Sequence, residues 1–285
     1  MIDIVTRIDD MSLVSEQRRS EGKIIGIVPT MGAIHEGHLS LIRRARDHSG
    51  FVVVSIFVNP AQFGPGEDFN KYPRDLEGDA RKIESAGADL IFAPTREEMY
   101  PAGYATYVTV ENLTGELCGR SRPTHFRGVT TVVAKLFIIV NPHVAVFGQK
   151  DAQQAAVIKR MVRDLNLPVT INVAPIVREP DGLAMSSRNS YLTAEQRRNA
   201  TVLYRSLRMA EELAASGVES SQEILQKVRE LIEKKEGAEI DYIDMVDPDE
   251  IHHVDKVGKS ALLALAVKFG DTRLIDNIML YGKEG

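Results

Sequence analysis

Two apolar runs with almost no polar interruption constrain the fold of this chain most strongly. They are IIGIVP at 24–29 and FVVVSIFV at 51–58, in which Ser55 is the one polar residue. A strand with one face in water alternates apolar and polar residues, whereas a strand covered on both faces reads as a continuous apolar run. The two runs therefore predict strands of a parallel sheet that has helices on both sides.

Segments with helical periodicity alternate with short strand-like runs as far as residue 176. Helices are expected from about His38 onward and at 75–86, 128–140 and 151–165, and further strands at 89–94, 105–110, 144–148 and 169–175. Alternation of this kind is typical of a doubly wound, Rossmann-like α/β domain.

The pattern changes in the last third of the chain. Two long amphipathic helices are expected at 194–215 and 220–235, followed by strands at 239–247, 261–270 and 272–280. Helices first and strands together afterwards suggest a smaller α+β domain. We expect the domain boundary near 176–190 and divide the chain into 1–177 and 178–285.

Composition excludes several functional classes. Lys plus Arg total 35 and Asp plus Glu total 40, which gives a net charge of −5 and no basic excess for nucleic acid or a membrane surface. Cys118 is the single cysteine, so neither an intrachain disulfide nor a cysteine-based metal cluster can form. Because the N-terminus lacks a signal-peptide pattern, and the longest apolar run at 132–140 is too short to span a bilayer, we expect a cytoplasmic protein.

The most informative loop, PTMGAIHEGH at 29–38, follows the first buried strand and opens the first helix. Ligands of doubly wound proteins bind at the carboxyl ends of the strands, and a helix N-terminus there favours phosphate. His35 and His38 are three residues apart and could both face one anion, or protonate a leaving phosphate. The alternative is two surface histidines at the start of a helix.

Three further pieces each have an ordinary alternative. Asn59 and Gln62 follow the second strand and could bind hydroxyl or carboxylate groups, or form a plain turn. Lys150 lies in GQKDAQQ (148–154), which could neutralise phosphate or simply begin a capped helix. AMSSRN at 184–189 could wrap phosphate oxygens through Arg188, or be a polar linker. All four pieces lie at strand ends or at the domain junction, which favours one shared site.

These pieces, in this order and spacing, resemble the pantoate–β-alanine ligases, also called pantothenate synthetases. The resemblance rests on PTMGAIHEGH, NPAQFGPGEDFNKYPR, HFRGVTTVVAKLF, FGQKDAQQ and AMSSRNSYL. HxGH and MSSR alone are similar to the nucleotide-binding elements of a wider adenylyl-transferring superfamily that includes class I aminoacyl-tRNA synthetases. NPAQF and GQKDAQQ make the resemblance specific.

The resemblance implies ATP-dependent condensation of (R)-pantoate with β-alanine to pantothenate, AMP and pyrophosphate, through a pantoyl adenylate. It also implies Mg²⁺ with ATP as co-substrate, no organic cofactor and a homodimer. The first domain would bind nucleotide and pantoate, and the second would form a lid over the active site. Segments 64–69 and 114–124 are candidate closable loops.

Site residues follow from the matched motif positions. The implied catalytic residues are His35, His38 as proton donor, Lys150 and Arg188. The implied ATP-binding residues are Met31, Gly32, Ala33, Ile34, His35, Glu36, Gly37, His38, Gly148, Gln149, Lys150, Asp151, Val177, Met185, Ser186, Ser187 and Arg188. Gln62 and Gln154 would bind pantoate, Gln62 would also face β-alanine, and Asp79 is the candidate near the metal. Thr124 departs from the family pattern, which usually has glycine there, so the flexibility of that segment could differ.

Two other functions remain open on the sequence alone. One is a nucleotidylyltransferase of the same superfamily that ends at a dinucleotide product. The other is a nucleotide-binding regulator without catalysis, which the presence of His35, His38, Lys150 and Arg188 disfavours. The apolar stretch 132–140 could serve as an interface between copies, but a buried core helix would explain it equally well.

Overall fold

The structure of the chain is a computed structural model that describes residues 2–282. Two compact units can be distinguished, and each is described by itself. The first runs to Glu111 and also contains Arg122–Gly148 and Val157–Pro175, and the second begins at Ile176. Two short segments that the expected boundary at 177/178 assigns to the first part, Asn112–Ser121 and Gln149–Ala156, group with the second unit.

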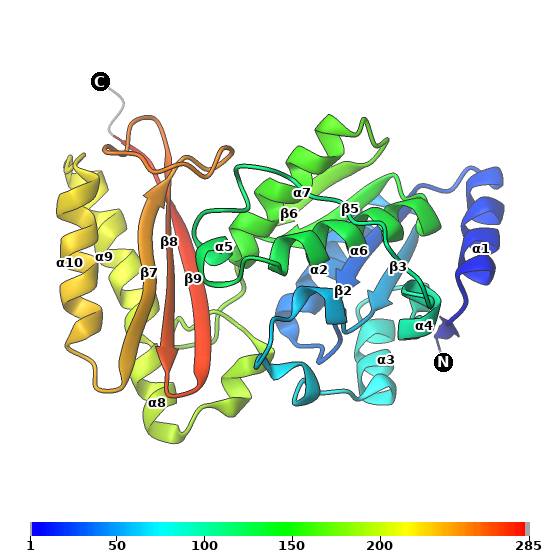
Figure 1. The fold of residues 1–285 in the computed structure, drawn as a ribbon, viewed down its shortest axis with the longest axis horizontal. Helices are drawn as coiled ribbons and strands as arrows, with labels where there is room; N and C mark the ends of the chain where they lie inside the picture. The colour runs from blue at the N-terminus through cyan, green and yellow to red at the C-terminus, as the bar shows by residue number, and fades with distance from the viewer. Residues whose placement is uncertain (1, 283–285) are drawn as a thin grey trace. The chain divides into compact units, whose positions relative to one another are not determined.

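A six-stranded parallel sheet forms the centre of the first unit (Figure 1). Its strands, in spatial order, are β1 (Asp3–Val5), β4 (Leu90–Phe92), β3 (Phe51–Ile56), β2 (Ile25–Thr30), β5 (Val144–Gly148) and β6 (Thr170–Ala174). The strand order runs outward in opposite directions from β2 and β5, which pair through Gly26 with Val144 and Ile27 with Ala145. This switch point is where open α/β sheets bind ligands, so the loop after β2 begins at the expected place.

Helices cover both faces of this sheet, as the continuous apolar runs predict. The helices are α1 (Ile8–Ser20), α2 (Glu36–His48), α3 (Leu76–Ser85), α4 (Arg96–Met99), α6 (His125–Val140) and α7 (Ala152–Asp164), with 3₁₀ turns η1 (Pro60–Gln62) and η2 (Asp68–Asn70). Alternate strand residues such as Val28, Val52 and Val54 join the core that Ile42 of α2 and Ile83 of α3 complete. Helices α1 and α6 pack on each other and on β2.

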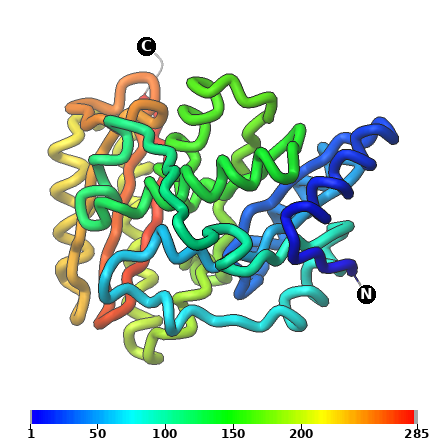
Figure 2. Tube along the Cα trace, turned by 45° about the vertical axis from the view of Figure 1, so that its right-hand side comes forward, coloured from blue at the N-terminus to red at the C-terminus, as the bar shows by residue number. Residues whose placement is uncertain are grey.

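The second unit pairs two helices with an antiparallel sheet. It contains α5 (Cys118–Ser121), η3 (Gln149–Asp151), η4 (Ser187–Tyr191), α8 (Ala194–Ala200), α9 (Val202–Ser216) and α10 (Ser221–Glu233). Its strands β7 (Ala238–Val246), β8 (Ala261–Phe269) and β9 (Thr272–Leu280) lie in that order. Segment 112–121 lies beside β7 (Figure 2), where Arg120 binds Asp244 and Ser121 binds Asp241. The predicted fold class, a Rossmann-like domain with a smaller α+β domain, is confirmed.

The predicted strand at 105–110 is wrong. The structure assigns no strand there, because hydroxyl groups of α6 bind the backbone in place of a neighbouring strand. The Val108 amide donates to Thr131 Oγ1 at 3.0 Å, and the Val108 carbonyl accepts from Thr130 Oγ1 at 2.6 Å. A β-branched, aromatic composition alone could not reveal these partners.

Two other differences concern helices. The helix expected at 194–215 is divided at Thr201 into α8 and α9. The N-terminal β1 and α1 were not predicted, since α1 buries only Met11 and Ser15 and has no clear apolar stripe.

Most of the apolar stretch 132–140 lies in the core as part of α6, with Ile138 exposed at 74%, so the core-helix interpretation is confirmed. Among residues 2–282, no helix has both the length and the apolarity needed to cross a membrane.

Candidate active site

The loop after β2 leaves the sheet through two consecutive residues with positive φ. Gly32 has φ +82° and Ala33 has φ +52°. Glycine adopts this conformation readily, but alanine does so at a cost of about 1–2 kcal/mol. Thr30 supports the turn, since its Oγ1 donates to the Ser55 carbonyl at 2.7 Å and accepts from the Gly32 amide at 3.2 Å. Such a strained backbone persists only where its surroundings hold it.

Asp79 of α3 provides that support. Its two carboxylate oxygens accept the amides of Ala33 and Ile34, each at 2.8 Å, and the residue is 3% exposed. Lys82, one turn further along α3, donates to the Ile34 carbonyl at 2.9 Å. The Asp79 carboxylate therefore holds the loop from inside the unit. Each of its oxygens accepts one backbone amide, and the described residues contain no group of three His, Cys, Asp or Glu side chains that could hold a metal by themselves.

His35 and His38 form the N-terminus of α2. His35 is the N-cap, its Nδ1 accepts the Gly37 amide at 3.2 Å, and His38 Nδ1 accepts the His35 amide at 3.4 Å. The two rings lie 4.1 Å apart between centroids. Because both Nδ1 atoms accept hydrogen bonds, the neutral imidazoles carry their protons on Nε2. The histidines thus present N–H donors at the positive end of a helix.

The loop after β3 brings Gln62 to the same sheet edge. Asn59 Nδ2 donates to Gln62 Oε1 at 3.1 Å and to the Gly128 carbonyl at 3.0 Å, while Gln62 Nε2 lies 3.1 Å from Met31 Sδ. Tyr100 donates its hydroxyl to Asn59 Oδ1 at 2.9 Å, and burial raises the pKa of that hydroxyl. The loops after β2 and β3 therefore meet through Met31 and Gln62.

Arg122 and His125 also converge on Gln62, which sequence reasoning missed. The Gln62 carbonyl lies 3.1 Å from Arg122 Nη2 and 2.9 Å from His125 Nδ1. Arg122 also binds both carboxylate oxygens of Glu67, at 2.8 and 2.6 Å. Burial acts to raise the pKa of Glu67, but Arg122 outweighs it and holds the pKa below its ordinary value. Segment 64–69 is therefore tied to the start of α6.

Gly148 ends β5 in the first unit, and the other predicted residues belong to the second unit. Lys150 lies in η3, with Nζ 4.0 Å from Asp151 Oδ2, and the backbone carbonyls of Gln149 and Lys150 both accept from Asn277 of β9. The neighbouring residues Gln153 and Gln154 differ in burial. Gln153 is 6% exposed and binds the backbone at Leu113, Glu116 and Cys118, so it pins segment 112–121. Gln154 is half-buried, which suits the predicted ligand-binding position better.

The MSSR segment is also fixed within the second unit. Ser186 caps η4 by accepting the Arg188 amide at 3.3 Å. The Met185 amide donates to the Val177 carbonyl at 3.0 Å, so two of the predicted nucleotide-contact positions are direct neighbours. Asn189 Nδ2 donates to Glu179 Oε1 at 2.6 Å and to the Ala184 carbonyl at 3.1 Å. The structure therefore holds Ser186 to Arg188 in a defined turn.

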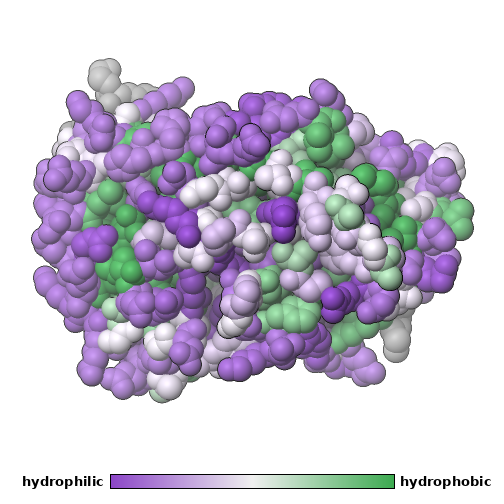
Figure 3. Space-filling view, viewed as in Figure 1, coloured by the Kyte–Doolittle hydropathy of each residue, from purple (hydrophilic) through white to green (hydrophobic). Residues whose placement is uncertain are grey.

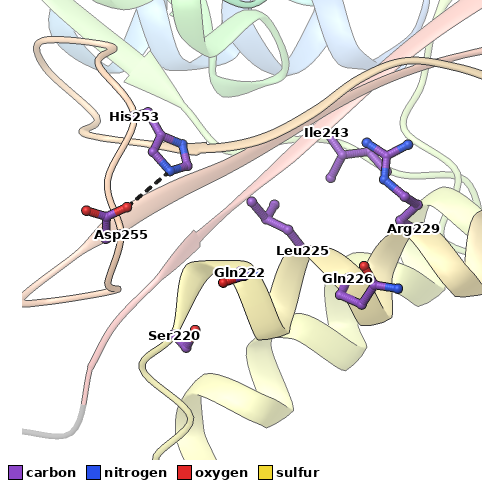
Figure 4. A pocket seen from close by; sticks show the side chains of 8 residues that line it. All are labelled: Ser220, Gln222, Leu225, Gln226, Arg229, Ile243, His253 and Asp255. Atoms are coloured by element: carbon purple, nitrogen blue, oxygen red, sulfur yellow. Dashed lines mark ion pairs between the residues drawn. The ribbon is translucent and has the colours of Figure 1, made fainter.

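A groove of about 540 Å³ in the second unit is a separate feature (Figure 4). Side chains of α10 line one side of it, and His253 and Asp255, which form an ion pair at 3.6 Å, lie at one end. Hydrophobic surface shows between α10 and β7 in Figure 3. None of the sequence-predicted site residues lines this groove.

The parallel sheet, the switch point after β2 and the paired histidines at a helix N-terminus define a Rossmann-like α/β protein with a ligand site at the switch point of its sheet. A family model described as pantoate-beta-alanine ligase matches residues 3–279. The chain belongs to this family, and it is a ligase that joins pantoate to β-alanine through an amide bond.

Similar proteins match this chain over nearly its whole length. Pantothenate synthetase from Acetivibrio thermocellus is 54% identical over 277 residues, which cover 97% of this chain and 99% of that protein. The crystal structure of pantothenate synthetase from Thermus thermophilus has a TM-score of 0.92 at 46% identity and covers 98% of this chain and 100% of that one. The Francisella tularensis pantoate-beta-alanine ligase, complexed with beta-gamma ATP and beta-alanine, has a TM-score of 0.80 at 34% identity, with 98% of each chain covered.

Proposed function

We propose that this ligase uses ATP as co-substrate and works in two half-reactions. In the first, a carboxylate oxygen of (R)-pantoate attacks the α-phosphorus of ATP, the bond to the β-phosphate oxygen breaks, and pyrophosphate leaves. In the second, the neutral amine of β-alanine attacks the acyl carbon of pantoyl adenylate, AMP leaves, and the amine loses a proton. The observation that carries the proposal is the pair of histidines with Nδ1 acceptors at the N-terminus of α2.

His35 and His38 serve the first half-reaction, in which two anions must come together. Their Nε2–H groups and the N-terminus of α2 offer donors for phosphate oxygens. His38 is the proposed proton donor to the leaving pyrophosphate. The strained backbone of Ala33, fixed by Asp79, sets the place from which α2 begins.

Gln62 is the proposed contact for both pantoate and β-alanine, and Gln154 for pantoate. Neutral amides bind hydroxyl and carboxylate groups without adding an ion pair that would compete with the phosphates. Asn59 fixes the orientation of the Gln62 amide, since Gln62 Oε1 accepts from Asn59 and Nε2 is directed toward Met31. The arrangement supports Gln62 as a prepared binding group.

The remaining nucleotide contacts are proposed from their motif positions, and all of them except Gly148 lie in the second unit. Gly148 to Asp151, Val177 and Met185 to Arg188 would contact ATP, with the Lys150 and Arg188 cations offsetting the charge of the phosphates. The direct pairing of Val177 with Met185 supports treating these segments as one surface. We further propose that this unit acts as a lid, that the protein is a cytoplasmic homodimer, and that it needs neither nucleic acid nor membrane.

Mg²⁺ is proposed to arrive with ATP rather than to reside in a protein site. Because Mg²⁺ is commonly held by one or two carboxylates together with substrate phosphates, the donors here would come mainly from the nucleotide. Asp79 is proposed as a carboxylate near that ion, since each of its oxygens accepts one backbone amide and keeps a second lone pair. No step of the proposed chemistry requires an organic cofactor.

The decisive experiment is pantoate-dependent exchange of labelled pyrophosphate into ATP in the absence of β-alanine. Wild-type protein should show exchange, and His38→Ala should reduce it at least a thousandfold. His48→Ala, at the other end of α2, is the matched control and should exchange as wild type does. Exchange with another acid but not with pantoate would refute the substrate assignment. A dinucleotide product would indicate the nucleotidylyltransferase, and ATP binding without exchange would indicate the regulator.

A further inference from the structure

Asn277 of β9 makes three hydrogen bonds to one short segment. Its Nδ2 donates to the carbonyls of Gln149 and Lys150, each at 2.9 Å, and its Oδ1 accepts from Gln149 Nε2 at 3.1 Å. The side chain is 3% exposed. Both amide hydrogens and the amide oxygen are thus used on the turn that carries Lys150, although 127 positions separate Asn277 from Lys150.

The preceding residue, Asp276, is fixed in a different way. It is 2% exposed, and its carboxylate binds both Nη atoms of Arg178 at 2.6 and 3.0 Å and the Asn277 amide at 2.8 Å. Burial raises the pKa of Asp276, and Arg178 acts in the opposite direction. A fork-to-fork pair of this kind holds its partner in one orientation more strictly than a single contact does.

Arg178 extends this connection to the MSSR segment. Its Nη1 donates to the Gly182 carbonyl at 3.1 Å, its backbone pairs with Ala184, and its guanidinium stacks 4.5 Å above the Tyr204 ring. Ala184 directly precedes Met185. Two adjacent residues of β9 therefore hold the two segments that carry the proposed cations of the second unit. Asn277 holds the turn with Lys150, and Asp276 holds the MSSR segment through Arg178.

We propose that Asp276 and Asn277 are positioning residues that set Lys150 and the MSSR segment in register with each other for the phosphates of ATP. The inference rests on the proposed function, because it takes Lys150 and Arg188 as the phosphate-binding cations. An amide suits position 277 because it donates to two carbonyls, whereas a carboxylate would repel them. The pair acts on adenylate formation, since only that half-reaction expels pyrophosphate.

The test compares the two half-reactions in Asn277→Ala. Adenylation, measured by pantoate-dependent pyrophosphate exchange, should slow about 30-fold, in line with the sensitivity of catalysis to small misplacements. Reaction of supplied pantoyl adenylate with β-alanine should slow less than threefold. Asp241→Asn is the matched control, because Asp241 also pairs with an arginine of β9, Arg273, but does not contact Gln149, Lys150 or Arg178. It should leave the ratio of the two rates unchanged.

A double-mutant cycle with Lys150→Ala makes the test stricter. If Asn277 acts through Lys150, the double variant should lie within threefold of Lys150→Ala in single-turnover adenylation. The proposal would be overturned if the losses of the two single variants multiplied in the double variant. It would also be overturned if Asn277→Ala slowed both half-reactions equally or left adenylation unchanged. Should Asn277→Ala fail to fold, Asn277→Ser, which keeps one donor, should still slow adenylation selectively. Absence of pantoate-dependent exchange in the wild type would refute the proposed function itself, which is a distinguishable result.

Discussion

The two units hold their proposed catalytic groups by opposite means. In the first unit, the loop before the histidines is fixed through its amides, which bind one buried carboxylate, Asp79. In the second unit, the turn with Lys150 is fixed through its carbonyls, which bind one buried amide, Asn277. Asp151 Oδ2 lies 4.0 Å from Lys150 Nζ, and a second carboxylate in the place of Asn277 would pair with the cation further, whereas the neutral amide leaves more of its charge for the nucleotide. The comparison shows that the anchor suits the charge of the group it positions.

Removal of the acidic anchor should have the largest effect. Asp79→Ala leaves the half-buried amide of Ala33 and the buried amide of Ile34 without an acceptor, so we expect the free energy of unfolding to fall by about 2–4 kcal/mol. Because the loop before α2 is released, pyrophosphate exchange should fall about 100-fold or more. Asp79→Asn keeps an acceptor and should recover part of both losses. Denaturant unfolding measures the loss of stability, and the exchange assay measures the loss of activity. Near-wild-type exchange in Asp79→Ala would contradict the role of Asp79 as the anchor of the loop before α2.

A change in the turn that Arg178 supports should come next. Gly182 has φ +94°, and a Cβ there would lie 1.9 Å from Tyr204 Cδ1. Gly182→Ala should therefore lower the free energy of unfolding by about 2–3 kcal/mol and slow adenylation about tenfold. Gly237, with φ +74° and nothing within 4 Å of its Cβ position, is the control. Its alanine variant should lose only about 1 kcal/mol and keep full adenylation. Equal losses in both would show that strain alone, and not the contact with Tyr204, decides the result.

The loop after β3 offers a third, smaller effect. Gly128 of α6 lies against it, and a Cβ there would be 2.3 Å from the Ala61 carbonyl oxygen. Gly128→Ala should displace Gln62 and raise the KM for pantoate about tenfold, while the KM for ATP changes less. Gly50→Ala, where the nearest atom lies 3.4 Å away, should leave both constants unchanged. Steady-state kinetics with pantoate and ATP varied in turn would measure both KM values. A rise in the KM for ATP alone would contradict the assignment of Gln62 to pantoate.

The smallest effect should be that of the ion pair between Glu67 and Arg122. The pKa of Glu67 is lowered on folding, so its stabilisation is present above the ordinary value of 4.5 and is lost as the pH falls below it. Glu67→Gln should cost about 1 kcal/mol at pH 7 and flatten the pH dependence of the melting temperature from about pH 5 down to about pH 3. Melting curves over that range test it. An unchanged slope would mean that other carboxylates cause the acid sensitivity.

The sequence was sufficient for the parts of the molecule that depend on local pattern. Continuous apolar runs predicted the parallel strands, and the helix expected from about His38 begins two residues earlier, at Glu36. The strand expected at 105–110 was wrong because its hydrogen-bond partners, Thr130 and Thr131, lie in a helix more than twenty positions further along. Burial also separated Gln153 from Gln154, which no periodicity could do.

Anchors at long sequence separation were the part that could not be predicted. Asp79 was noticed for its position after YPR as a candidate near the metal, but its hydrogen bonds to the backbone amides of Ala33 and Ile34 were not predicted. Asn277 lies in a strand-like run and carried no motif at all. In both cases the role of the side chain depends on a turn that lies far away in the sequence and is brought beside it by the fold.

The late position of β9 has a consequence for synthesis on the ribosome. Translation delivers Asp79 only 45 residues after Ile34, so the loop before α2 can acquire its anchor early. The turn with Lys150 must wait for Asn277, 127 residues later. A nascent chain can therefore fix the loop that precedes the histidines long before it can fix the turn that carries Lys150. Polypeptides released prematurely, before β9, would lack the second anchor and should not form the adenylate efficiently.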